Sequence, residues 1–148
     1  SCALPISPVR TVVLGTSLVR NGLIHRDRYL RWLERIDEPV AYFPHRREDP
    51  GDLDRVRRIA GLTVYDAGAP AEMTLRDLRP DQRVLSLPST AVTSLRVLLS
   101  ARGVRVEAVD VPDDWWTASA VPSLRSHLQL FAHEPHQPLT HDPGKVAP

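Results

Sequence analysis

Short apolar runs of strand length alternate along the chain with segments whose apolar positions recur at helical spacing. The runs are rich in valine, leucine and aromatic residues and end at glycine, proline or polar residues, which is typical of buried strands. They predict strands at residues 11–14, 39–43, 62–65, 83–86 and 104–109. The intervening patterns predict helices at residues 26–36, 49–60, 75–78, 89–101 and 122–131.

This alternation of strands and helices is typical of βαβ units, in which successive strands lie parallel with helices on both faces of the sheet. The expected fold is therefore α/β, with a single Rossmann-like, doubly wound parallel sheet of about five strands. A chain of 148 residues corresponds to about one domain. We assign residues 1–132 to it, because residues 133–148 contain four prolines without periodicity and indicate an extended or disordered tail.

Composition excludes several classes of protein. With 42% hydrophobic and 25% charged residues the chain is typical of a globular domain. It lacks an apolar stretch long enough to span a membrane, and its first five residues do not resemble a signal peptide, so a cytoplasmic location is expected. The single cysteine, Cys2, excludes an internal disulfide, and a net charge of +1 does not favour nucleic-acid binding.

Ligands of such folds bind beyond the carboxyl ends of the strands, where helix N-termini present free amides. The first loop there, Gly15-Thr-Ser-Leu-Val-Arg-Asn-Gly22, contains neither a dinucleotide fingerprint nor a phosphate-binding P-loop. The second, Tyr42-Phe-Pro-His45-Arg-Arg-Glu48-Asp49, places an imidazole and two guanidinium groups just past a strand. It is either an exposed polar turn or a site that protonates and pairs with a phosphate.

Two later loops add a carboxylate and hydroxyl groups. Glu72 follows the third predicted strand and is either a surface acid or a ligand of ribose hydroxyls. Ser89 and Thr90 begin a predicted helix, as a simple N-cap or as part of a phosphate cradle. Taken together, His45, Glu72 and this hydroxyl pair suit a nucleoside monophosphate.

The order and spacing of these motifs resemble bacterial sialyltransferases. The similar segments are Gly15-Thr-Ser-Leu-Val-Arg-Asn-Gly22-Leu-Ile, Tyr29-Leu30, Tyr42-Phe-Pro-His45-x-x-Glu48, Pro70-Ala-Glu72 and Ser89-Thr90, within residues 10 to 112. The similarity is to the GT-B-type α-2,3-sialyltransferases of lipooligosaccharide synthesis and to bacterial polysialyltransferases. It implies that this chain is one half of a GT-B architecture, the C-terminal half that binds the donor CMP-sialic acid.

The resemblance also implies roles for individual residues. His45 matches the general acid toward the CMP phosphate, Glu72 the ribose ligand, and Ser89 with Thr90 the phosphate-binding serine pair. Donor contacts are further expected from Gly15, Thr16 and Arg46. The family reaction inverts the anomeric carbon without a metal or another cofactor, and its partners are a nucleotide-sugar donor, a glycan acceptor and a second Rossmann-like domain.

Departures from the family pattern leave two hypotheses open. The family's general-base aspartate falls on Asn21, whose amide has no useful basicity, and its His-Pro pair is His45-Arg46 here. Asp27 could replace the base only if the loop folded back. The chain is thus either the donor-binding half of a sialyltransferase-like enzyme or a catalytically degenerate nucleotide-binding or protein-interaction module. A chance coincidence of motifs on an unrelated α/β domain is a third alternative.

Trp115 and Trp116 follow the fifth predicted strand. They either stack against a base or sugar ring or anchor the last segment of the chain.

Overall fold

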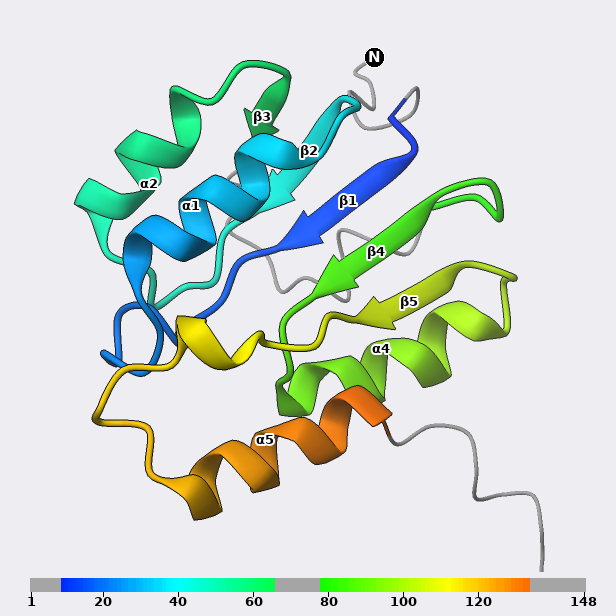
Figure 1. The fold of residues 1–148 in the computed structure, drawn as a ribbon. Helices are drawn as coiled ribbons and strands as arrows, with labels where there is room; N and C mark the ends of the chain where they lie inside the picture. The colour runs from blue at the N-terminus through cyan, green and yellow to red at the C-terminus, as the bar shows by residue number, and fades with distance from the viewer. Residues whose placement is uncertain (1–8, 66–77, 134–148) are drawn as a thin grey trace, which may run out of the picture.

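The computed structural model describes residues 9–65 and 78–133. Five parallel strands form one sheet in the order β3-β2-β1-β4-β5 (Figure 1). Their bounds are β1 Thr11–Leu14, β2 Val40–Phe43, β3 Leu62–Val64, β4 Arg83–Ser86 and β5 Arg105–Ala108. The predicted α/β fold with a single Rossmann-like sheet is confirmed.

Helices cover both faces of this sheet. Their bounds are α1 Arg26–Arg35, α2 Pro50–Arg57, α4 Thr90–Ser100 and α5 Pro122–His133, with a 3-10 turn, η2, at Asp113–Trp115. Helices α1 and α2 lie on one face and α4 on the other, as expected when right-handed crossovers run toward opposite edges (Figure 1). Glu72 and residues 75–77 of the helix predicted at residues 75–78 lie outside the described residues, and Leu78, the last residue of that prediction, is not helical.

Helix α2 begins where the sequence predicts but ends earlier. The Asp49 carboxylate accepts hydrogen bonds from the amides of Gly51 and Asp52, at 2.9 and 3.2 Å, and Pro50 occupies the first turn. The helix ends at Arg57 instead of reaching Gly61, because the chain turns there to enter β3. Gly61 makes this turn with a φ of +81°, a conformation that favours glycine.

Each face of the sheet has its own hydrophobic core, since strands buried on both sides are apolar along their whole length. All four residues of β1 and of β2 are buried. On the α4 face, Val92, Leu95 and Leu99 pack against the sheet. On the other face, Tyr29 and Leu33 of α1 pack against the strands, and Leu128 of α5 joins the same cluster.

The two tryptophans anchor the segment that follows β5. Trp115 and Trp116 are only 7% and 6% exposed, so their rings do not stack against an external base or sugar. The backbone carbonyl of Trp115 accepts a hydrogen bond from the His25 amide at 2.8 Å, and the Thr117 amide donates to the Leu23 carbonyl at 2.9 Å. This segment therefore lies against the loop that follows β1.

Among the helices of the described residues, none combines the length and the apolar character needed to cross a membrane.

Candidate functional site

Three of the predicted ligand-binding loops lie next to one another at the carboxyl edge of the sheet. β2, β1 and β4 are neighbours, so His45, Gly15 with Thr16, and Ser89 with Thr90 follow adjacent strands. Strands lie about 4.8 Å apart, which separates the ends of β2 and β4 by about 10 Å. The chain leaves β1 toward one edge and β4 toward the other, and folds of this kind bind ligands at this switch point.

The loop after β1 is held by backbone hydrogen bonds. The Gly15 amide donates to the Phe43 carbonyl at 2.7 Å, which extends the contact between β1 and β2 by one residue. Thr16 is buried, and its hydroxyl accepts a hydrogen bond from the Leu18 amide at 3.1 Å. Asn21 lies farther along this loop with an exposed side chain. The hydroxyl of Thr16 is therefore already used within the loop, whereas Asn21 is accessible to solvent.

A buried carboxylate fastens the loop after β2. Glu48 is only 9% exposed, and its Oε1 accepts a hydrogen bond from the His45 amide at 2.8 Å. Its Oε2 accepts one from the Tyr42 hydroxyl at 2.7 Å, and this hydroxyl lies 2.8 Å from that of Tyr29. The loop that carries His45 is thus tied to β2 and α1 through one carboxylate.

Burial raises the pKa of Glu48 to about 7, although the hydrogen bonds from Tyr42 and His45 act in the opposite direction. The nearby Asp52 adds to the rise, while Asp52 itself forms an ion pair with Arg26. Burial likewise raises the pKa of the Tyr42 hydroxyl. Glu48 therefore gains or loses its proton near neutral pH, at the point where it holds the His45 loop.

The role of Glu48 in holding the loop after β2 was not predicted from the sequence, where Glu48 was named only as the last residue of the motif Tyr42-Phe-Pro-His45-x-x-Glu48. The available signal was an acid three residues after the histidine at a strand end, together with two tyrosines in the same motif set. The space that Glu48 occupies exists because residue 15 is glycine: a Cβ on Gly15 would collide with Oε1 of Glu48 and would lie 2.6 Å from the His45 amide nitrogen.

His45 is half-buried and oriented by its own loop. Its Nδ1 accepts a hydrogen bond from the Arg47 amide at 3.0 Å, so the neutral ring carries its proton on Nε2. Burial lowers the pKa of His45, and the positive charges of Arg46 and Arg47 lower it further. Without a bound anion, the ring is therefore a neutral hydrogen-bond donor through Nε2 at pH 7.

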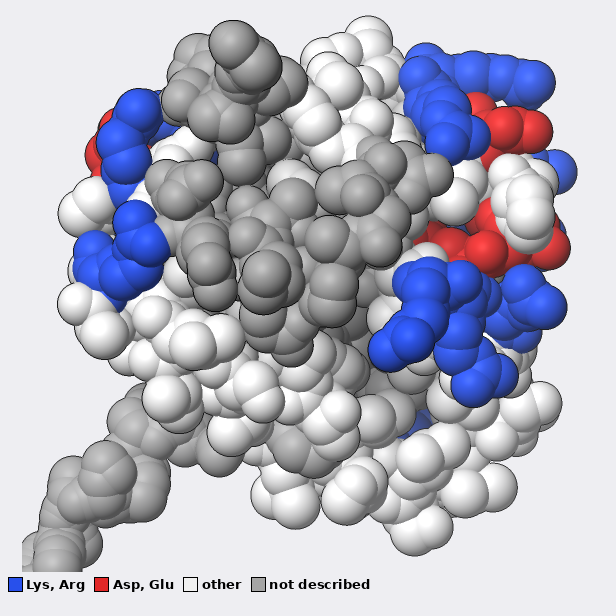
Figure 2. All heavy atoms as spheres, turned by 180° about the vertical axis from the view of Figure 1, so that it is seen from behind, with Lys and Arg blue, Asp and Glu red and all other residues white. Residues whose placement is uncertain are grey.

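Positive charge surrounds His45. Arg20, Arg46 and Arg47 are all exposed, and Nη1 of Arg20 donates a hydrogen bond of 3.5 Å to the Arg47 carbonyl. Seen from behind, the side of the molecule where α2 and β3 lie carries several basic side chains, with acidic side chains between them (Figure 2). The loops after β1 and β2 can thus attract an anionic ligand toward the imidazole.

Helix α4 begins without a side-chain cap, although one interpretation of Ser89 from the sequence is a simple N-cap. Ser89 occupies the N-cap position in extended backbone, yet its hydroxyl makes no capping hydrogen bond. Within the described part of the chain, the Ser89 hydroxyl and the amides of Thr90 and Ala91 have no hydrogen-bond partner. A helix N-terminus in this state presents donors and the positive end of its dipole to an anion.

No protein-family model matches the chain, and neither the curated proteins nor the solved structures compared with it include a match.

Among residues 9–65 and 78–133, no three His, Cys, Asp or Glu side chains lie together as a group that could hold a metal ion. Glu72, the sequence-predicted ribose ligand, lies outside these residues. The site as described therefore consists of His45 with its neighbouring arginines, the Gly15–Thr16 backbone, and the free N-terminus of α4.

Proposed function

We propose that this chain binds a CMP-sugar donor, CMP-sialic acid or a similar compound, as the donor-binding domain of a sialyltransferase-like protein. The observation that carries the proposal is the uncapped N-terminus of α4 at the switch point beside β1, with His45 two strands away in the loop after β2. This arrangement offers donors for phosphate oxygens and an imidazole within the span of one nucleotide.

Each group has a role in this proposal. The Ser89 and Thr90 hydroxyls and the α4 amides bind phosphate oxygens, and the Gly15 and Thr16 backbone lies beneath the ligand. His45 donates a hydrogen bond from Nε2, and Arg46 supplies charge. A bound phosphate favours the charged imidazole, which restores the proton that a general acid delivers to the leaving CMP. By resemblance to the family, Glu72 binds the ribose hydroxyls.

A second candidate function is a degenerate module that binds the nucleotide or a protein partner without catalysis. Asn21 favours it, because an exposed amide stands where the family has its general base and cannot accept a proton from an acceptor hydroxyl. In either case the glycan acceptor and a second Rossmann-like domain are partners that the resemblance implies.

Calorimetric titration with CMP tests the binding site shared by both candidates. We expect saturable binding, and we expect His45→Ala and Ser89→Ala each to weaken it about 10-fold or more, since a hydrogen bond to a charged group contributes about 1.5–3 kcal/mol. Glu72→Ala is expected to weaken it as well. Two matched controls, His127→Ala on α5 and Ser94→Ala on the exposed side of α4, should bind CMP like the parent. Absence of heat at millimolar CMP contradicts both nucleotide-binding candidates.

The release of CMP from CMP-sialic acid separates the enzyme from the degenerate module. We expect Asn21→Asp to raise turnover about 100-fold or more over a slow parent, since a general base contributes about 10²–10⁴-fold. Asn21→Ala, which adds no base, should remain at the parent rate. If the parent already turns over and the aspartate adds nothing, residue 21 is not the position of the base. If CMP binds and neither protein turns over, the degenerate module is favoured.

A further inference from the structure

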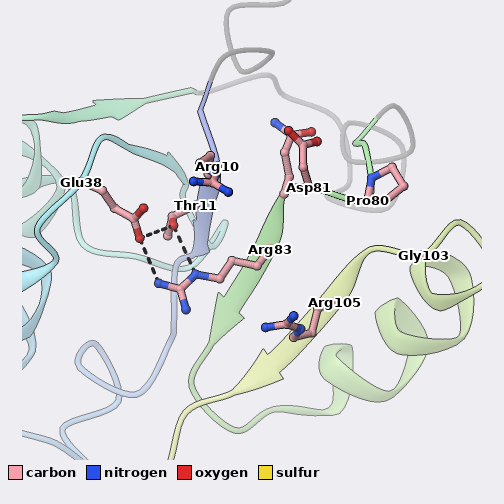
Figure 3. Close-up of a pocket in the computed structure, with 9 residues that line it drawn as sticks. Arg10, Thr11, Glu38, Pro80, Asp81, Arg83, Gly103 and Arg105 are labelled. Carbon is pink, nitrogen blue, oxygen red and sulfur yellow. Dashed lines mark hydrogen bonds and ion pairs between the residues drawn. The ribbon is translucent and has the colours of Figure 1, made fainter.

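A polar pocket lies at the amino edge of the sheet, opposite the candidate site. Its volume is about 320 Å³, and it lies at the starts of β1, β4 and β5 and the turns that precede them. The residues that line it are Arg10, Thr11, Glu38, Pro80, Asp81, Gln82, Arg83, Gly103 and Arg105 (Figure 3). Pockets that hold small ligands have volumes from about 300 Å³ upward, so this one has room for a small molecule.

The register of the sheet creates the pocket's row of polar groups. Thr11, Arg83 and Arg105 are paired as the first residues of β1, β4 and β5. Residues at matching positions of parallel strands point to the same face, so the hydroxyl and two guanidinium groups lie in one row. Arg10 precedes this row, and its carbonyl accepts a hydrogen bond from the Arg83 amide at 2.8 Å.

Arg83 is fixed by its neighbours and is not free to follow a ligand. Its Nη2 lies 2.9 Å from Oε2 of Glu38, and its Nε donates to the Thr11 hydroxyl at 3.3 Å. The Thr11 hydroxyl in turn donates to the same Glu38 oxygen at 2.7 Å. Figure 3 shows the Arg83 side chain extending from β4 toward Thr11 and Glu38. These contacts hold its positive charge in place beside the pocket.

Arg10 and Arg105 have guanidinium donors to spare. The Arg10 side chain makes neither a hydrogen bond nor an ion pair with any residue in the described part of the chain, although its charge adds to the lowering of the Glu38 pKa that the hydrogen bond from Thr11 mainly causes. Arg105 is exposed and uses only Nη1, which lies 3.2 Å from Oε2 of Glu107. Because β1 and β5 both neighbour β4, these two arginines lie on either side of Arg83.

The charges of this region do not cancel. Glu38 is paired with Arg83, Glu107 with Arg105, and Asp81 with Arg79. Arg10 is the fourth arginine beside these three carboxylates and leaves one positive charge without a counterpart. An anion of charge −1 or −2 is therefore the ligand that this pocket attracts.

We propose that the pocket binds the carboxylate or phosphate group of a small polar molecule. Arg10 and Arg105 contact this group, and the fixed guanidinium of Arg83 adds positive charge beside it. Guanidinium groups bind both kinds of oxyanion through paired N–H donors, which an ammonium group does not offer. The polar lining excludes a large apolar ligand. The site lies at the other end of the sheet from His45 and Ser89 and stands whether or not a nucleotide binds there.

Amide NMR titrations with inorganic phosphate and with succinate, at constant ionic strength, test the proposal and distinguish the two sources. We expect saturable shifts at the amides of Thr11, Arg83 and Arg105 with at least one of these anions. Arg10→Gln and Arg105→Gln should each weaken that binding about 10-fold. Arg83 is left intact, because its loss would also release Glu38.

Arg57→Gln is the matched control, since Arg57 is an exposed arginine that pairs with Asp54 on α2, away from the pocket. It should bind the anion like the parent. Shifts that grow without saturation, or equal weakening by Arg57→Gln and Arg105→Gln, overturn the proposal. Shifts confined to the Thr90 and Ala91 amides also overturn it, while they support the separate site at the carboxyl edge.

Discussion

Gly15→Ala is expected to destabilise the protein by about 3 kcal/mol or more, the upper range for overpacking of a tightly filled site. A Cβ at this position collides with the Glu48 carboxylate and lies 2.6 Å from the backbone nitrogen of His45. The carboxylate cannot simply move away, because it is held by the Tyr42 hydroxyl as well as by the His45 amide. Either these hydrogen bonds break or the loop after β2 is displaced from β1.

Gly51→Ala is the matched control for this substitution. Gly51 lies in the first turn of α2, is exposed, and a Cβ there meets only the carboxylate of Asp49, at 3.0 Å. Alanine favours a helix over glycine by about 0.5–1 kcal/mol, so this variant should be close to the parent or slightly more stable. Urea unfolding of the parent and both variants checks the comparison. Equal stabilities for the two variants contradict the tight packing described between Gly15, His45 and Glu48.

The elements that local rules govern could be predicted from the sequence. The central strands β1 and β2 are short apolar runs because both of their faces are buried, and they begin and end within one residue of the prediction. The start of α2 follows from the capping chemistry of Asp49 and Pro50, which involves only neighbouring residues. The parallel direction of the strands follows from the alternation of strands and helices.

Features that depend on residues far apart in sequence could not be predicted in the same way. Gly15 and Glu48 come together only after β1 and β2 have paired. The sequence alone therefore indicates neither the need for glycine at position 15 nor the burial of Glu48. The orientation of the Ser89 hydroxyl is also a tertiary property, since the residue type alone favours a cap. The pocket lined by Arg10, Arg83 and Arg105 depends on the strand register, which no local pattern encodes.

The parent is expected to lose stability as pH rises, because Glu48 ionises. In Glu48→Gln this contribution to the pH dependence of the free energy of unfolding is expected to be absent. Burial raises the pKa of this carboxyl in the folded protein from 4.5 to about 7. Between these values the folded protein holds a proton that the unfolded chain releases, so the free energy of unfolding falls with increasing pH. The contribution of protonated Glu48 is complete below pH 4.5 and is lost as pH passes 7. Its upper limit is about 3 kcal/mol.

Glutamine can replace the protonated carboxyl without breaking the network. Its Oε1 can still accept from the His45 amide, and its Nε2 can donate to the Tyr42 hydroxyl, which then donates to Tyr29. His45 acts with the opposite sign, because its lowered pKa means that the unfolded chain binds more protons and stability rises with pH. The difference in stability between parent and Glu48→Gln at each pH therefore isolates Glu48.

Urea unfolding at pH 5, 6, 7 and 8 measures this difference, with Glu34→Gln, an exposed glutamate on α1, as the matched control. We expect the free energy of unfolding of Glu48→Gln to rise steadily relative to that of the parent from pH 5 to 8. The free energy of unfolding of Glu34→Gln should change with pH in the same way as that of the parent. A difference that does not change with pH contradicts a raised pKa for Glu48.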